Sequence, residues 1–323
     1  MAKINRIGVL TSGGDAPGMN AAIRAVVRSC SYYGITCLGI HRGYNGLING
    51  DIVTMDARSV NGVISRGGTM LYTARCPEFM TEEGVKKAIG TCKYLGIDGI
   101  IAIGGDGTFR GARDLAAHGV PTIGIPATID NDIASTQYSI GFDTACNTAQ
   151  DAIDKLRDTM QSHERCSVVE VMGRNAGHLA LHVGIATGAT AILVPEKELD
   201  MEQDVIEKIR LGRINKRSHF IIIVAEGVGS AMKVAEKIKE ETGIDARVTI
   251  LGHIQRGGSP SAEDRVWATR MGEYAVTGIL NGKSNRVVCV VNDKLIDMDI
   301  NEALEMHKDL PNEMYLTSKM MAV

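Results

Sequence analysis

A turn between an expected strand and an expected helix combines glycines with one acid and one hydroxyl. The apolar run 99–103 predicts a buried parallel strand, and residues 109–115 favour a helix. Between them lies the segment GGDGT, residues 104–108. Glycines let a ligand approach the backbone, and a helix N-terminus offers free N–H groups to anionic oxygens. Because a bare carboxylate repels phosphate, Asp106 indicates either a metal ion between the two or a simple helix cap.

A second candidate site is the acidic loop 126–133, which follows the next expected strand. Asp130 and Asp132 are two residues apart, so on extended backbone their side chains point the same way. Two carboxylates in one direction repel each other unless a cation or a proton bridges them. One could accept a proton from a substrate hydroxyl while the other helps to hold Mg²⁺. An Asx-rich turn is the simpler alternative.

Two further segments could bind phosphate. The loop 13–18 nearly fits a P-loop, but Met19 and Asn20 stand where Lys and Ser or Thr are required. Its glycine N–H groups could still hold a phosphate, or the segment is a plain loop. Arg75 could neutralise a phosphate with its guanidinium, although a surface salt bridge is the more ordinary role.

The second half of the chain places cations and an acid where expected strands end. Arg174, Glu226, His253 and Arg256 all occupy such positions. Arginines suit a phosphate and a carboxylate suits sugar hydroxyls, so the group fits a phosphorylated polyol. A lone histidine is more often structural.

Composition narrows the class of protein. The chain has 323 residues, with 44% hydrophobic and 23% charged residues, which is ordinary for a globular protein. A net charge of −3 and 4% aromatic residues argue against nucleic acid and an acidic membrane surface as partners. The seven cysteines form no C-x-x-C pair, which indicates reduced thiols in a cytoplasm. We find neither a signal-peptide pattern nor a run of about 18 apolar residues, so a cytoplasmic protein is expected.

Apolar strands alternate with amphipathic helices along the chain, which is typical of an α/β protein with parallel sheets. Strands are expected at 6–11, 35–40, 99–103, 120–125, 166–172, 191–194, 220–225, 247–251 and 286–291. Helices are expected at 19–33, 81–95, 109–118, 142–162, 176–187, 202–211, 231–242 and 262–280, with some helical character near 59–65 in the irregular stretch 43–68. These strands exceed one comfortable sheet. We therefore predict two doubly wound, Rossmann-like lobes with mostly parallel sheets and with ligands beyond the carboxyl ends of the strands.

The chain resembles the bacterial type of ATP-dependent 6-phosphofructokinase from about Arg6 to about Ser318. The resemblance rests on TSGGDAPGMNAAIR, RGGT, YTARCPEF, IGGDGT, TIDND, IGFDTA, SHER, VEVMGR, AEG and LGHIQRGGSP, in this order. The Gly-Gly-Asp-Gly turn alone also occurs in NAD and lipid kinases. The family implies an ATP-binding lobe of residues 1–141 plus about 255–305. It implies a sugar-phosphate lobe of residues 142–254 plus about 306–323, with the active site between the lobes.

The resemblance also implies roles for individual residues. ATP would be held by Gly14, Arg75, Cys76, Gly105, Asp106, Gly107 and Thr108, with Asp106 as the Mg²⁺ ligand. Asp130 would take the proton of the sugar 1-hydroxyl, and the catalytic set would be completed by Thr128, Asp132 and Arg174. Fructose 6-phosphate would contact Thr128, Ile129, Asp130, Met172, Gly173, Arg174, Glu226, His253, Ile254, Gln255 and Arg256. Arg165 and Arg247 would reach into a neighbouring subunit's site, which implies a homotetramer with shared sites.

Two positions bear on the phosphoryl donor. Pyrophosphate-dependent members of the family carry Asp in place of Gly107 and Lys in place of Ile129. Glycine and isoleucine leave room for the α-phosphate, which favours ATP. The alternatives are a pyrophosphate-dependent enzyme and a catalytically dead, metabolite-sensing paralogue. A dehydrogenase fits less well, because the first loop lacks G-x-G-x-x-G.

An effector site is implied as well. Arg24 and Arg28 lie one helical turn apart, which alone would suit a solvated helix face. The family adds a site for ADP as activator and phosphoenolpyruvate as inhibitor, formed by Arg24, Arg28, Arg157, Gly188, Thr190, Asn215, Arg217, Ser218 and His219. Thr190 replaces a usual glutamate, and Asn215 and Ser218 replace usual basic residues. Fewer charges predict weaker anion binding and blunted allostery. Met80, in place of a usual basic residue, predicts a softer affinity for ATP.

Overall fold

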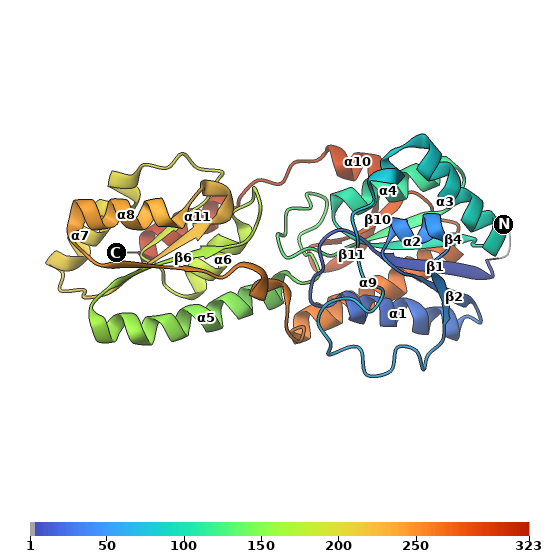
Figure 1. Ribbon diagram of the computed structural model, residues 1–323, viewed down its shortest axis with the longest axis horizontal. Helices are drawn as coiled ribbons and strands as arrows, with labels where there is room; N and C mark the ends of the chain where they lie inside the picture. The colour runs from blue at the N-terminus through green and yellow to red at the C-terminus, as the bar shows by residue number, and fades with distance from the viewer. Residues whose placement is uncertain (1–3, 323) are drawn as a thin grey trace. The chain divides into compact units, whose positions relative to one another are not determined.

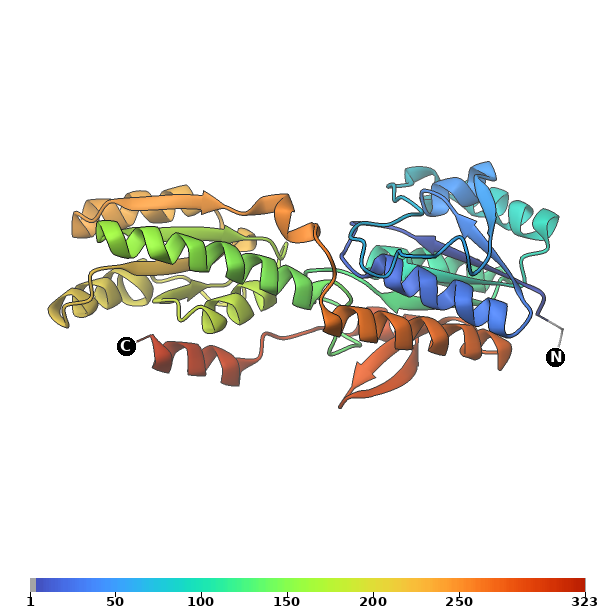
Figure 2. The same ribbon diagram turned by 90° about the horizontal axis from the view of Figure 1, so that it is seen from below.

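A computed structural model describes residues 4–322 (Figures 1 and 2). The chain forms two compact units. Unit 1 comprises Met1–Thr128, Ile133–Thr144 and Arg256–Lys308, and unit 2 comprises Ile129–Asp132, Ala145–Gln255 and Asp309–Val323. The predicted lobe boundaries place the acidic loop in the first lobe, whereas residues 129–132 group with unit 2. Within residues 4–322, no helix combines the length and the apolar character needed to cross a membrane.

Unit 1 is built on a seven-stranded sheet with the order β11-β10-β5-β4-β1-β2-β3. Its strands are β1 (Arg6–Thr11), β2 (Thr36–Ile40), β3 (Ile52–Met55), β4 (Gly99–Gly104), β5 (Thr122–Pro126), β10 (Arg286–Val291) and β11 (Lys294–Asp299). The central strands pair in parallel, whereas the edge strands β3 and β11 are antiparallel to their neighbours. Strand β4 is buried along its whole length, as its continuous apolar run predicts.

Helices pack against this sheet. They are α1 (Met19–Tyr32), α2 (Tyr44–Asn49), α3 (Glu82–Leu95), α4 (Asp106–Ala117), α9 (Ala262–Leu280) and α10 (Ile300–Glu305), with the 3-10 turn η1 (Pro77–Met80). Helices α1 and α9 lie side by side (Figure 2). They approach closely because α9 has Gly272 at the contact, where an added Cβ would lie 2.6 Å from the Cβ of Ala25.

Unit 2 has a four-stranded, fully parallel sheet with the order β7-β8-β6-β9. Its strands are β6 (Cys166–Val171), β7 (Ala191–Leu193), β8 (Phe220–Ala225) and β9 (Ala246–Ile250). Its helical elements are α5 (Phe142–His163), which starts in unit 1, α6 (His178–Ala186), η2 (Glu202–Ile206), α7 (Glu207–Ile214), η3 (Glu226–Val228), α8 (Ala231–Thr242), η4 (Gly252–Arg256), which ends in unit 1, and α11 (Asn312–Met321). Its core includes the buried inward-facing residues Phe220, Ile222 and Val224 of β8.

The structure corrects the expectations for residues 43–68. The stretch 59–65, expected to have helical character, forms turns instead. Helix α2 and strand β3 lie earlier in this stretch and were not predicted. An element of four to six residues is too short to show a clear periodicity.

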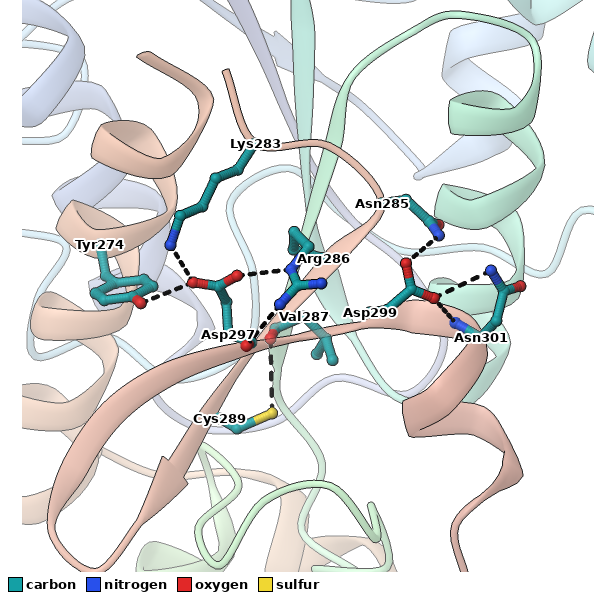
Figure 3. A network of polar contacts seen from close by, with 9 residues as sticks. All are labelled: Tyr274, Lys283, Asn285, Arg286, Val287, Cys289, Asp297, Asp299 and Asn301. Atoms are coloured by element: carbon teal, nitrogen blue, oxygen red, sulfur yellow. Dashed lines mark hydrogen bonds and ion pairs between the residues drawn. The ribbon is translucent and has the colours of Figure 1, made fainter. Parts of the chain in front are cut away.

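Strand β11 was also missed, although the turn before it carries a sequence signal. Asn292 and Asp293 both have positive φ, 49° and 60°, and link β10 to β11 as a tight hairpin. Asp297 on β11 forms ion pairs with Lys283 and Arg286 and accepts a hydrogen bond from the Tyr274 hydroxyl (Figure 3). This buried carboxylate fastens the hairpin to the end of α9.

Candidate active site

The loops after β1 and β4 are locked together in unit 1. The Ser12 amide donates to the Ile103 carbonyl at 3.0 Å, and Thr108 Oγ1 donates to the Ser12 carbonyl at 3.0 Å. A Cβ on Gly104 would clash with both Thr108 Oγ1 and the Ser12 carbonyl. Gly104 is therefore required by packing, and the phosphate loop, defined as residues 12–18, is held against the start of α4.

Asp106 is the first residue of α4, and the N-cap is Gly105. The helix-cap interpretation of Asp106 is therefore wrong. An added Cβ would meet no heavy atom within 4 Å at Gly105 or Gly107. A glycine inside a helix costs roughly 0.5–1 kcal/mol relative to alanine, and no packing demand accounts for Gly107. Gly107 therefore leaves open space beside the N-terminus of α4.

Asp106 fits a magnesium ion that is shared with phosphates. It is half-buried in the first turn of α4, at the edge where the free helix N–H groups lie. Among residues 4–322, no group of three or more His, Cys, Asp or Glu side chains gathers as a metal site. Mg²⁺ needs no such cage, because it is commonly held by one or two carboxylates together with substrate phosphates.

Arg75 lies on a loop attached to the phosphate loop. Thr11 Oγ1 donates to the Tyr72 carbonyl at 2.8 Å, and Thr73 Oγ1 donates to the Gly13 carbonyl at 2.6 Å. Arg75 is exposed and forms no ion pair or hydrogen bond with the residues the structure describes. The surface-salt-bridge interpretation is therefore not supported, and the guanidinium is available to an anion. Cys76, the next residue, is half-buried.

In unit 2, a buried carboxylate meets a cation. Asp130 is fully buried, and Arg174 Nε lies 3.2 Å from Asp130 Oδ2. The spacing argument for paired carboxylates fails, because Asp130 lies in a turn and Asn131 has a φ of 49°. Asp130 and Asp132 are thus not on extended backbone, and Asp132 is half-buried. Arg174, a cation, is a partner of Asp130 in the structure.

The end of β6 is fixed by the end of β8, its parallel neighbour. Glu226 Oε1 accepts hydrogen bonds from the backbone N–H groups of Gly173 at 3.2 Å and of Arg174 at 2.7 Å. This bend needs positive φ at both residues, 140° and 53°. Glu226 therefore holds the backbone that presents Arg174 to Asp130. Met172, just before the bend, is buried.

Arg165 and Arg247 lie at the opposite edge of the same sheet. They stand at the amino ends of β6 and β9, where both contact Asp245, Arg165 Nε at 3.2 Å and Arg247 Nη2 at 2.9 Å. At about 3.3 Å per residue, β6 separates them from Arg174 by roughly 20 Å. Within unit 2, they cannot reach the ligand that Arg174 would bind.

The predicted substrate-binding residues in the segment after β9 differ in their exposure and in their contacts. His253 and Ile254 are exposed, whereas Gln255 is fully buried and its Nε2 donates to the Gly252 carbonyl at 3.0 Å. Arg256 Nη1 donates to the Asp15 carbonyl of the phosphate loop at 3.1 Å. Gln255 thus stabilises its own turn, and Arg256 is attached to unit 1.

The predicted effector residues form two groups, one in each unit. On α1, burial and the positive charge of Arg28 lower the pKa of Arg24. In unit 2, burial and the charges of Arg157 and Arg217 lower the pKa of His219. Arg157 also donates to the carbonyl of Thr187, the neighbour of Gly188. The remaining members of the second group are Thr190, which is almost fully buried, Asn215, which ends α7, and Ser218, which is half-buried.

Two polar residues that hold loops of the candidate site were not predicted from the sequence. Ser139 is fully buried, and its Oγ accepts from the Thr128 amide at 2.8 Å. Asn20, noted only for replacing a P-loop residue, bonds to the loop that leads to Arg75. Partners 11 to 50 positions away along the chain leave no local signal in the sequence.

Glycine-lined loops at the carboxyl ends of parallel strands, with an acid opening the next helix, define a doubly wound α/β protein that handles phosphorylated ligands. The Phosphofructokinase family profile matches residues 6–279, and the chain belongs to this family. The predicted family resemblance is thereby confirmed.

Named relatives cover the whole chain. It is 55% identical to the ATP-dependent 6-phosphofructokinase of Bacillus subtilis (strain 168) over 320 residues, which are 99% of this chain and 100% of that protein. It is 56% identical to the enzyme of the same name from Clostridium botulinum (strain Hall) over 309 residues, 96% of this chain and 97% of that protein.

Solved structures share the fold. Phosphofructokinase from Saccharomyces cerevisiae superposes with a TM-score of 0.89 at 35% identity, covering 99% of this chain and 48% of that one. A pyrophosphate-dependent phosphofructokinase from Marinobacter aquaeolei gives a TM-score of 0.85 at 21% identity over 96% of this chain and 86% of that one, which shows the fold alone. The prediction of two Rossmann-like lobes with mostly parallel sheets is confirmed.

Proposed function

We propose that the chain is an ATP-dependent 6-phosphofructokinase. It transfers the γ-phosphoryl group of Mg-ATP to the 1-hydroxyl of fructose 6-phosphate and releases fructose 1,6-bisphosphate and ADP, a step of glycolysis. The observation that carries the proposal is the fully buried Asp130 carboxylate beside the Arg174 guanidinium. A buried base next to a cation suits proton removal from an alcohol while negative charge moves onto a phosphoryl group.

Each residue has one task in the reaction. Asp130 accepts the proton of the 1-hydroxyl as that oxygen bonds to the γ-phosphorus and the bond to the bridging oxygen of ADP breaks. Arg174 and Arg75 stabilise the charge on the transferred group, whose transition state is loose and is catalysed mainly by placement and electrostatics. Asp106 would hold Mg²⁺, which would supply further positive charge to the phosphates when bound. The glycine N–H groups of the phosphate loop position the donor.

ATP is the proposed donor because of two uncharged positions. Gly107 has open space beside it, which leaves room for the α-phosphate. Ile129 is fully buried and uncharged, so it does not supply the positive charge that a lysine provides at this position in pyrophosphate-dependent members of the family. These features argue against pyrophosphate as the donor.

A coupled assay of fructose 6-phosphate phosphorylation tests the proposal with ATP and with pyrophosphate as donors. We expect ATP to support turnover and pyrophosphate to give at most a small fraction of that rate. Equal or greater turnover with pyrophosphate would overturn the donor assignment. No turnover with either donor would overturn the proposed activity.

The proposal includes a homotetramer with shared sites in the cytoplasm. The support for shared sites is the position of Arg165 and Arg247. They lie too far along the sheet to contact the ligand that Arg174 of the same subunit would bind. If they serve a neighbour, mixing Arg247→Ala subunits with Asp130→Ser subunits creates some sites with both residues intact. The mixture should then be more active than either parent. Activity equal to the mean of the parents would contradict shared sites.

ADP and phosphoenolpyruvate are the proposed effectors. Arg157, Arg217 and His219 share one electropositive neighbourhood, which suits an anion. Thr190 brings no carboxylate for an effector-bound metal ion, and it is almost fully buried. We therefore propose a weaker allosteric response than the family pattern implies.

A further inference from the structure

The loop that carries Arg75 is anchored by a buried amide on the first turn of α1. We call residues 65–75 the arginine loop. The side-chain nitrogen of Asn20 donates to the carbonyls of Arg66 at 3.0 Å and Gly67 at 3.1 Å, and Asn20 Oδ1 accepts from the Met70 amide at 2.7 Å. Asn20 is 3% exposed, so these contacts are made away from water.

The amide of Asn20 is matched to this loop in its polarity. Asparagine has two donors on its nitrogen and an acceptor on its oxygen, and here both ends are used by backbone groups. Aspartate has the same shape but no donor when ionised, so its oxygen would face two carbonyl oxygens. A buried polar group that loses its partner is costly, which makes this position sensitive to a single atom.

Further contacts hold the arginine loop against the phosphate loop and its neighbours. Thr69 Oγ1 lies 2.8 Å from Thr11 Oγ1, at the end of β1. Thr73 Oγ1 donates to the Gly13 carbonyl at 2.6 Å, two residues before Arg75. A Cβ on Gly67 would clash with the carbonyl of Gly258, which lies on the loop that also holds Arg256. The arginine loop is thus pinned along its length, with Asn20 at its first half.

We infer that Asn20 is a positioning residue for the phosphoryl donor, acting through the arginine loop to fix Arg75 over the phosphate loop. The inference rests on the proposed function, in which Arg75 binds the donor phosphates. The motif position that lacks the P-loop hydroxyl therefore has another task, the alignment of a guanidinium that follows 55 residues later in the chain.

Asn20→Asp tests the inference with nearly unchanged volume. We expect the kcat/KM for ATP to fall at least about 10-fold at pH 8, because small misplacements of a binding group are costly, while the KM for fructose 6-phosphate changes less than about 3-fold. The introduced carboxyl regains a donor when it is protonated, so the ratio of variant to wild-type kcat/KM should rise as the pH is lowered toward 6. Asn49→Asp is the matched control, because Asn49 is exposed and its amide bonds only within α2.

A double-mutant cycle with Arg75→Ala separates positioning from general damage. If Asn20 acts through Arg75, the loss caused by Asn20→Asp should shrink to less than 3-fold in the Arg75→Ala background. Asn20→Ser, which keeps a donor and an acceptor, carries the same cycle if the carboxylate prevents folding.

The inference is overturned by a folded Asn20→Asp variant with wild-type kinetics for ATP, or by losses that multiply fully in the double variant. Should the wild type use pyrophosphate in place of ATP, the same cycle with pyrophosphate still decides the role of Asn20. A failure of the proposed donor and a failure of the inference are therefore distinguishable.

Discussion

Gly107→Asp should stabilise the fold and impair ATP use at the same time. Gly107 is the second residue of α4, it is exposed, and an added side chain meets open space. Replacing a helical glycine with aspartate recovers only about 0.3 kcal/mol, because aspartate is itself a poor helix former, and a carboxylate in the first turn adds about 0.3–1 kcal/mol. Repulsion from the adjacent Asp106 offsets part of this gain. We expect the free energy of unfolding to rise by about 0.5–1 kcal/mol.

The same carboxylate would stand against the α-phosphate of ATP. Two unit charges 4 Å apart repel by about 4 kcal/mol at an effective dielectric constant near 20, and exposure and salt reduce this to roughly 1–3 kcal/mol. At 1.4 kcal/mol per factor of ten, the kcat/KM for ATP should fall about 10- to 100-fold. The assay is steady-state turnover at varied ATP, beside a urea titration of the same variant.

Two control variants sharpen the test. Gly90→Asp, on α3, also replaces an exposed helical glycine that has open space beside it, and it should leave the KM for ATP unchanged. Gly107→Ala separates volume from charge and should cost less activity than Gly107→Asp. A Gly107→Asp enzyme with an unchanged kcat/KM for ATP would refute the placement of the α-phosphate at this glycine.

Three further predictions address the base, the hairpin network and the effectors. Asp130→Ser should lower kcat roughly 10²-fold or more with little change in the KM for fructose 6-phosphate, and a near-wild-type kcat would remove Asp130 from the mechanism. Burial opposes ionisation of Asp297, but hydrogen bonds from Lys283, Arg286 and a tyrosine outweigh it and lower its pKa (Figure 3). The stabilisation that ionised Asp297 provides is therefore present above about pH 4 and is lost as the pH falls through the lowered pKa. Asp297→Asn should lower the free energy of unfolding by about 2 kcal/mol at pH 7 and by less in acid. Urea titrations that give the same loss at every pH would contradict this prediction. Saturation curves for fructose 6-phosphate should shift only weakly with ADP or phosphoenolpyruvate because Thr190 lacks a carboxylate, and strong shifts would count against blunted allostery.

The central strands could be predicted from the sequence because buried strands consist of continuous apolar runs. β4 and β8 show this most clearly, since every residue of each is buried. The edge strands of unit 1, β3 and β11, were missed because they are short or alternate with polar residues, as in β11. A pattern that measures burial cannot find strands whose pairing is set by a turn such as Asn292-Asp293.

In the candidate site, features set by neighbouring residues in the sequence could be predicted, whereas contacts between residues far apart in the sequence could not. Asp106 and Gly107 could be predicted as candidates because a strand, a turn and a helix follow one another in the sequence. The partner of Asp130 was misjudged, because Asn131 adopts a left-handed conformation that no spacing rule anticipates, and Arg174 lies 44 positions away. Family resemblance supplied both residues to the site, but their contact is a result of the fold.

Gly104 and Gly107 look equivalent in the motif, yet their surroundings assign them different tasks. At Gly104 a side chain would collide with Thr108 Oγ1 and the Ser12 carbonyl, so the fold itself excludes every other residue. At Gly107 an added Cβ meets no heavy atom within 4 Å, and a helical glycine costs stability relative to alanine. Open space alone does not identify a ligand, because Gly90 on α3 is also an exposed helical glycine whose added Cβ would meet no heavy atom within 4 Å. Gly107 differs from Gly90 in its position, because it lies in the first turn of α4 beside Asp106 and the free helix N–H groups, where the proposed donor phosphates would lie.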